Sequence, residues 1–346
     1  MSQKRENYID MIKTFAIFGV IVIHICGVGL MHPVASPEWT GALVWRCLCG
    51  ASVPLFFMCS GALMISRGEL PLKRLWLHYI PRLLFATLFY AAVYKLYHLG
   101  ETGDFSAQAL LQAAKEVLTF RHQTHLYYMH IILLVYAMLP VTRVFARKAQ
   151  KDELRYFLAI WALLGIIYPT LRPFWPFSRI SGIPAQYLIN MTWAAIGYGV
   201  LGYYIHKYPV KRGAAAVSAL AGLAFMFAGT WKLTVHNGLE TEVSAAFLEG
   251  MSAGVCLMAF GLYSLARGIK LRSGGAISAF TFLSKASMFT YLIHMLVYFI
   301  LQRFGLSVDM FTPWLSIPFM ALLTLLISVL LYVPVSRVPV VRDWLC

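Results

Sequence analysis

Long runs of apolar residues recur along the whole chain and are separated by short polar segments. Each run approaches the ~20 residues that an α-helix needs to cross the hydrocarbon core of a bilayer. In that environment only helices and closed barrels satisfy their backbone hydrogen bonds. We therefore predict an all-α, polytopic membrane protein with one domain, residues 1–346, and about ten transmembrane helices. The predicted spans are residues 9–30, 42–65, 76–97, 125–142, 155–171, 186–205, 214–231, 246–265, 278–301 and 314–333.

The composition and the placement of charge extend this interpretation. Hydrophobic residues make up 60% of the chain and charged residues 12%, whereas soluble domains contain about 25% charged residues. Of the 29 Lys and Arg, 19 lie in the termini and connections on one side of the predicted spans and 6 on the other. Because positive residues favour the cytoplasmic side, both termini are predicted to be cytoplasmic. Anionic membrane lipids and a phosphorylated cytosolic ligand are the expected partners of this charge, and nucleic acid is not.

Two ionisable residues lie inside the first predicted span, at Lys13 and His24. Such residues are costly to place in a hydrocarbon-length helix and therefore indicate function. Eleven helical steps return to nearly the same face, and they separate the two residues by about 16 Å. This spacing suits contacts with the two ends of one extended ligand. Lys13 would bind the charged end, and His24 would supply the reactive side chain at the other end. The alternative is that Lys13 extends to the lipid headgroups and His24 is a buried structural histidine.

The ninth predicted span carries polar residues at 3/4/3 spacing, so that Ser284, Ser287, Tyr291 and His294 share one helical face. His294 lies about as deep in its span as His24 lies in the first, past the bilayer midplane toward the exterior. His125 opens the fourth span from that exterior side. We therefore predict that the three histidines converge on a polar cavity in the outer half of the membrane.

A basic run of residues 73–82 precedes the third predicted span. One interpretation is ordinary positive charge at the cytoplasmic side of a span. The other is that Arg74 and Arg82 bind the phosphates of a ligand, a role to which the guanidinium group is suited.

Three further segments carry structural predictions. The exterior connection 98–124 contains a stretch, residues 105–118, that is expected to form a short amphipathic helix. The Pro- and aromatic-rich segment 172–187 is expected at the outer membrane interface or at the rim of an acceptor cleft. Within residues 52–61 of the second span, Pro and Gly allow helices to bend or to approach closely. The six cysteines have no metal-ligand spacing, so we predict no metal site and a packing role for them.

Four patterns in these segments follow one another in a fixed order. They are Lys13-x10-His24, residues 52–58 (Ser-Val-Pro-Leu-Phe-Phe-Met) followed by Ser60-Gly61, residues 125–128 (His-Leu-Tyr-Tyr), and Ser287-x3-Tyr291-Leu292-Ile293-His294. With these motifs the chain resembles the acyltransferase-3 family of bacterial membrane O-acyltransferases, from Tyr8 to the tenth predicted helix. It looks most similar to the stand-alone enterobacterial-common-antigen O-acetyltransferase type, since no hydrolase-like domain is appended.

The resemblance implies transfer of an acyl group, usually acetyl, from cytosolic acyl-CoA to a glycan hydroxyl across the bacterial inner membrane. It implies His24 as the catalytic residue. The assignment of the remaining residues is a hypothesis that joins this resemblance to the patterns above. His294 and Tyr291 are expected beside His24, acyl-CoA is expected on Lys13, Arg74 and Arg82, and the acceptor on His125, Tyr127 and Ser287. Two departures from the family pattern are Lys13, where the family often has Arg, and Tyr127-Tyr128, where Trp-Phe is usual.

Two other classes of protein fit part of this pattern. A proton-coupled transporter or flippase also has many spans, intramembrane His and Lys, and broken helices. Against it, the chain has no detectable inverted repeat and no intramembrane carboxylate beyond Asp10, at the start of the first span. A structural or sensory membrane protein is the third interpretation. Release of thiol from acyl-CoA that depends on His24 distinguishes the enzyme from both.

Overall fold

The structure is a computed structural model that describes residues 6–68, 70–180, 182, 186–239 and 243–345, and all regular structure in these ranges is helical. The α-helices are α1 (Asn7–Gly29), α2 (Pro37–Leu48), α3 (Ser52–Ser66), α4 (Leu72–Arg74), α5 (Ile80–Thr102), α6 (Ala107–Leu118), α7 (Tyr127–Lys148), α8 (Lys151–Ala162), α9 (Tyr168–Leu171), α10 (Met191–Lys207), α11 (Arg212–His236), α12 (Ala253–Arg267), α13 (Gly274–Arg303), α14 (Pro313–Val335) and α15 (Pro339–Leu345). Single π-helical turns, η1 (Leu75–Tyr79) and η3 (Leu163–Ile167), join α4 to α5 and α8 to α9.

Eight helical stretches in the described residues are long and apolar enough to cross a membrane, which confirms the prediction of an all-α polytopic membrane protein. The other two predicted spans correspond to α10, with 17 residues, and α12, with 15. The prediction for 246–265 began too early, because the chain makes a 3-10 turn at Ala245–Phe247 and α12 starts only after Ser252. The Ser252 hydroxyl accepts a hydrogen bond from the N–H of Val255 and caps the helix there.

The second predicted span is not one continuous helix. It breaks after α2 and resumes as α3 at Ser52, with Pro54 in the first turn, where its missing N–H is tolerated. Further along α3, Gly61 faces the backbone of Gly199 in α10 so closely that a Cβ atom at Gly61 would overlap the Gly199 carbonyl. The expected close approach of helices at this motif is therefore present, and small residues permit it.

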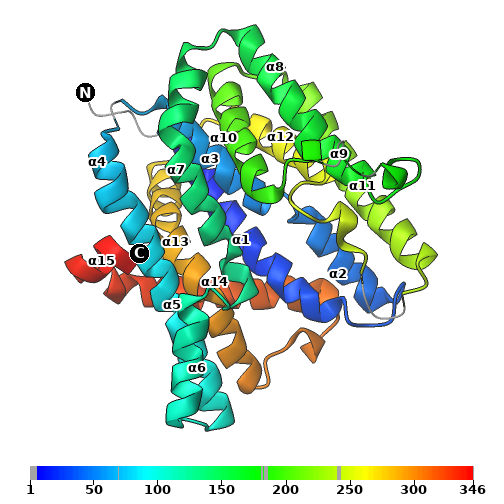
Figure 1. Ribbon diagram of the computed structural model, residues 1–346. Coiled ribbons are helices and arrows are strands. Elements are labelled where there is room, and N and C mark those ends of the chain that lie inside the picture. The colour runs from blue at the N-terminus through cyan, green and yellow to red at the C-terminus, as the bar shows by residue number, and fades with distance from the viewer. Residues whose placement is uncertain (1–5, 69, 181, 183–185, 240–242, 346) are drawn as a thin grey trace.

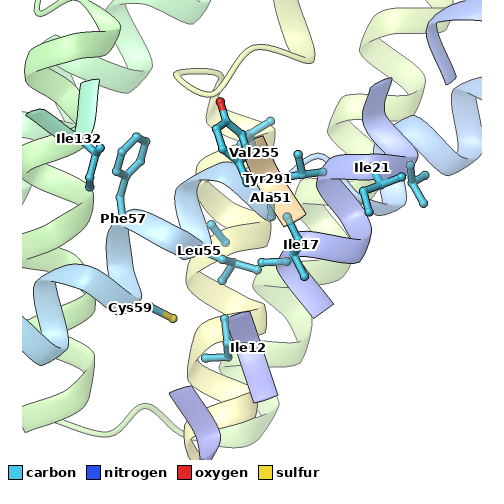
Figure 2. Close-up of a cluster of buried hydrophobic side chains, with 14 of the residues drawn as sticks. Ile12, Ile17, Ile21, Ala51, Leu55, Phe57, Cys59, Ile132, Val255 and Tyr291 are labelled. Carbon is cyan, nitrogen blue, oxygen red and sulfur yellow. The ribbon is translucent and has the colours of Figure 1, made fainter. Parts of the chain in front are cut away.

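Helix α1 lies at the centre of the bundle and packs against α2, α3, α12, α13 and α14 (Figure 1). Its apolar side chains enter the core on several sides. Figure 2 shows Ile12, Ile17 and Ile21 of α1 in the buried cluster that also contains Leu55 of α3 and Tyr291 of α13. These neighbours bury the polar side chains of Asp10 and Thr14 and leave those of Lys13 and His24 half-buried.

The two connections that the sequence predicts to be exterior both contact neighbouring elements through their described residues. The amphipathic helix predicted at 105–118 is α6, which lies beside the lower end of α5 in Figure 1 and is tied to it by an ion pair between Lys95 and Glu116. In segment 172–187, of which residues 181 and 183–185 lie outside the described residues, Phe174 stacks on Phe247 with ring centroids 5.5 Å apart. This contact places the segment beside residues 243–252.

Candidate active site

The three histidines predicted to converge do so. The ring centroids of His24 and His294 are 5.2 Å apart, those of His125 and His294 5.2 Å, and those of His24 and His125 5.9 Å. They come from α1, from the 3-10 turn Thr124–Leu126 (η2) and from α13. Segments separated by 101 and 169 residues along the chain therefore form one cluster of imidazole rings, which we call the histidine cluster.

A hydrogen bond to the backbone defines which nitrogen of the His294 ring carries the proton. Its Nδ1 lies 2.7 Å from the main-chain carbonyl oxygen of Tyr291, and because a carbonyl only accepts, Nδ1 carries the proton. The Nε2 atom of His294 is buried without a hydrogen-bond partner, and so is Nε2 of His125. Buried polar atoms of this kind normally have a partner. The cluster thus offers two imidazole nitrogens to a polar group of a ligand or to water.

Tyrosine hydroxyls hold the backbone around the cluster. The hydroxyl of Tyr291 donates to the main-chain oxygen of His125, which links α13 to η2. The hydroxyl of Tyr94 in α5 donates to the carbonyl of Leu292 at 3.0 Å and accepts from the N–H of Leu296 at 3.1 Å. Tyr94 was not predicted as part of the site, because one tyrosine in an aromatic-rich span gives no distinctive signal.

The three rings differ in how accessible they are. The His294 side chain is fully buried and that of His125 is 4% exposed, whereas His24 is half-buried. Of the three rings, His24 is therefore the most accessible, and none of the three lines either of the two cavities described next.

A cavity of about 140 Å³ is lined by Lys13, the predicted ligand-binding lysine, and by Tyr291, whose ring centroid lies 5.9 Å from that of His294. Three of the predicted site residues, Lys13, Ser287 and Tyr291, line it together. The hydroxyl of Ser287 donates to the carbonyl of Ser284 at 2.8 Å. The remaining lining residues are Val20, Val53, Phe56, Ser60, Leu83, Tyr128, Met129, Ile132, Tyr136 and Met288. We call this the inner cavity.

The two predicted phosphate-binding arginines do not line the inner cavity. Arg74 is exposed and Arg82 is half-buried. The guanidinium of Arg74 lies over the ring of Tyr79, 5.6 Å from its centroid, and Tyr79 lies 6.5 Å from Tyr136, a residue of the cavity wall. Arg74, the last residue of α4, is thus separated from the cavity by the rings of Tyr79 and Tyr136.

A second cavity, of about 330 Å³, lies beside the first and shares Val53 with it. Tyr127 is the one predicted acceptor-binding residue in its wall; its side chain is 41% exposed. The remaining lining residues are Ile23, Arg46, Gly50, Pro54, Met191, Leu248, Glu249, Gly250 and Met251. We call this the outer cavity, since residues 248–251 lie before α12 and follow the connection 232–245, which the sequence predicts to be exterior.

Sequence reasoning missed Arg46 as a residue of this site. Its Nη2 donates to the carbonyl oxygen of Leu248 at 3.1 Å, and its Nη1 is buried without a partner. The available signal was an arginine inside a predicted span, which indicates function by the same argument as Lys13 and His24.

Among the described residues, no group of three or more His, Cys, Asp or Glu side chains could hold a metal ion. The cysteines described are free thiols, buried or half-buried; Cys346 lies outside the described residues.

Comparison with protein families decides the class to which this site belongs. The acyltransferase-3 family, described as an acyltransferase domain, matches residues 6–333. The chain belongs to the acyltransferase-3 family. The matched region of this family member contains the whole histidine cluster and both cavities, and the family supports acyl transfer as the activity. Searches of curated proteins and of solved structures gave no match.

Proposed function

We propose that this acyltransferase-3 protein moves an acyl group, acetyl in the first instance, from cytosolic acyl-CoA to a hydroxyl of a cell-envelope glycan or lipid-linked saccharide. It acts as an O-acetyltransferase of the bacterial inner membrane, of the enterobacterial-common-antigen type, with both termini in the cytoplasm. The observation that supports this proposal is the histidine cluster beside two cavities that share Val53: the ring of His294 lies 5.9 Å from that of Tyr291 in the inner cavity, and His24 follows Ile23 of the outer cavity.

In this proposal the donor enters from the side of Lys13. The ammonium group of Lys13 holds a CoA phosphate, with Arg74 and Arg82 adding positive charge at the cytoplasmic face. The pantetheine arm then extends along α1 through the inner cavity. The helical rise from Lys13 to His24, about 16 Å, suits an extended chain that ends in a thioester beside the histidine cluster.

His24 acts as the general base. Its neutral imidazole takes the proton of the acceptor hydroxyl as the oxygen attacks the thioester carbonyl carbon. The carbon–sulfur bond then breaks, CoA leaves as the thiolate, and the proton on His24 passes to that sulfur. His294 and Tyr291 orient the ring or stabilise the oxyanion that forms on the carbonyl oxygen. The alternative, an acyl-histidine intermediate on His24, uses the same residues in two steps.

The acceptor enters from the outer cavity. Tyr127 lines that cavity, His125 belongs to the cluster, and Ser287 lines the inner one. An acceptor hydroxyl near Val53 would meet the thioester where the two cavities share a wall.

The test is acetyl transfer from labelled acetyl-CoA by the purified protein in liposomes. Wild type is expected to release CoA, and His24→Ala to lower the rate by about 100-fold or more. His236→Ala is the matched control, because His236 is exposed at the end of α11, and its rate is expected to stay at the wild-type level. If wild type neither binds nor turns over acetyl-CoA, the proposal is wrong and transport becomes the better hypothesis.

A further inference from the structure

Arg46 has an unusual electrostatic environment for a residue within a predicted span. It forms no ion pair in the described part of the chain, and one carbonyl oxygen, that of Leu248, is its hydrogen-bond acceptor. The buried Nη1 atom has no acceptor at all. A guanidinium group has five N–H donors and stays charged.

An uncompensated charge away from water is energetically costly, and proteins keep such groups paired or in contact with a functional pathway. The acidic residue in the same cavity, Glu249, does not supply this compensation, because its side chain is exposed and it forms no ion pair among the described residues. Arg46 therefore keeps the capacity to bind an anion that comes from outside the protein.

The place of Arg46 points to the acceptor as the source of that anion. The outer cavity that Arg46 lines includes Ile23, which precedes His24, and shares Val53 with the inner cavity. Lys13, which serves the donor in the proposed function, lines the inner cavity instead. Lys13 and Arg46 thus belong to two different cavities that share Val53.

We propose that the outer cavity binds an acceptor that carries an anionic group, a phosphate or a carboxylate, held by Arg46. This inference rests on the proposed function and specifies its acceptor. The planar guanidinium matches both oxyanions in a bidentate geometry. Glu249 at the same cavity accepts hydrogen bonds from neutral hydroxyls of the saccharide. The anion thereby fixes the acceptor so that one of its hydroxyls reaches His24.

The experiment measures binding of three sugars to the full-length protein in nanodiscs by calorimetry. The probes are glucose 1-phosphate, glucuronate and glucose, which separate a phosphate from a carboxylate and both from the neutral sugar. Wild type is expected to bind at least one of the two anions about tenfold or more tightly than glucose, and Arg46→Gln is expected to lose that preference.

Two further variants keep this result decisive. Arg46→Lys retains the charge without the bidentate fork and is expected to bind the anionic sugar with intermediate affinity. It replaces Arg46→Gln as the test variant if Arg46→Gln fails to fold. Arg303→Gln removes the same charge from an exposed site, where Arg303 pairs with Glu101 at 2.9 Å, and is expected to bind like wild type. Equal binding of all three sugars to wild type, or a preference for anions that survives in Arg46→Gln, overturns the inference.

Failure of the inference and failure of the proposed function give different results. Binding of acetyl-CoA is measured on the same wild-type preparation without any sugar. Acetyl-CoA binding without anion preference contradicts the anionic acceptor alone, whereas absence of acetyl-CoA binding contradicts the acyltransferase mechanism itself.

Discussion

The Nδ1 atom of His294 donates a hydrogen bond to the main-chain oxygen of Tyr291, 2.7 Å away. This contact fixes the tautomer, so that the buried Nε2 atom presents a lone pair and no proton. The neighbouring ring, His24, lies 5.2 Å away between centroids. A contact within α13, from the His294 side chain to the backbone three residues earlier, thus sets the tautomer that His294 presents to its neighbour.

The first prediction concerns His294→Asn. The asparagine amide can still donate to the carbonyl of Tyr291, but the side chain has no atom at the Nε2 position. We expect kcat for acetyl transfer to fall by about 100-fold, with the KM for acetyl-CoA and the melting temperature close to wild type. Steady-state kinetics in liposomes checks the result, and a kcat near the wild-type value would show that Nε2 has no part in the reaction.

The second prediction concerns the donor. If Lys13 holds a CoA phosphate, Lys13→Ala raises the KM for acetyl-CoA about tenfold and changes kcat little, because the lost interaction is equal in the ground and transition states. Lys13→Arg should restore most of the affinity. Lys285→Ala is the matched control, since Lys285 is an exposed lysine in α13. A fall in kcat alone would contradict a role in donor binding.

The third prediction concerns the packing of α3 against α10. A methyl group added by Gly61→Ala would overlap the carbonyl of Gly199, so the helices must move apart. We expect a loss of stability of about 1–3 kcal/mol, as for other overpacked interiors. Gly213→Ala in α11, where no atom lies within 4 Å of the added Cβ, is expected to be neutral or stabilising. Thermal melting in detergent compares the two, and equal melting temperatures would refute the close contact.

The fourth prediction is a pH dependence of the loop that precedes η2. Burial is the main cause that lowers the pKa of His122 below its ordinary value of 6.5, and the charge of Lys95 adds to it. The ring of His122 stacks on that of His130, with 3.1 Å between the two Nε2 atoms. Because the unfolded loop binds the proton more readily, the stability contributed by His122 is complete above pH 6.5 and is lost as the pH falls from there toward the lowered pKa.

Hydrogen exchange of residues 119–123 between pH 7.5 and pH 5 measures this effect. Protection is expected to decrease toward acidic pH in wild type and to change less in His122→Gln, which cannot take up the proton. The same decrease in both proteins would assign the pH dependence to other groups.

Much of this architecture follows from the sequence alone. The positions of the helices came from runs of apolar residues, since a bilayer leaves a chain few alternatives to helices of fixed length. The convergence of His24, His125 and His294 was also predictable, because helical rise converts sequence distance from the membrane surface directly into depth. The Lys13-x10-His24 spacing and the ordered motifs likewise indicated the family that the whole-chain match confirms.

The tertiary structure decided which of these groups share a cavity and how deeply each is buried. It separated the exposed Arg74 from the cavity that Lys13 lines, and it brought Arg46 and Tyr94 to the site from helices whose sequences gave weak signals. The physical reason is that the depth of a residue in the membrane depends only on the rise along its own helix. The direction in which a helix turns its side chains, and the helices that surround it, depend on packing. Here that packing is set by the break between α2 and α3 and by the contact of Gly61 with Gly199.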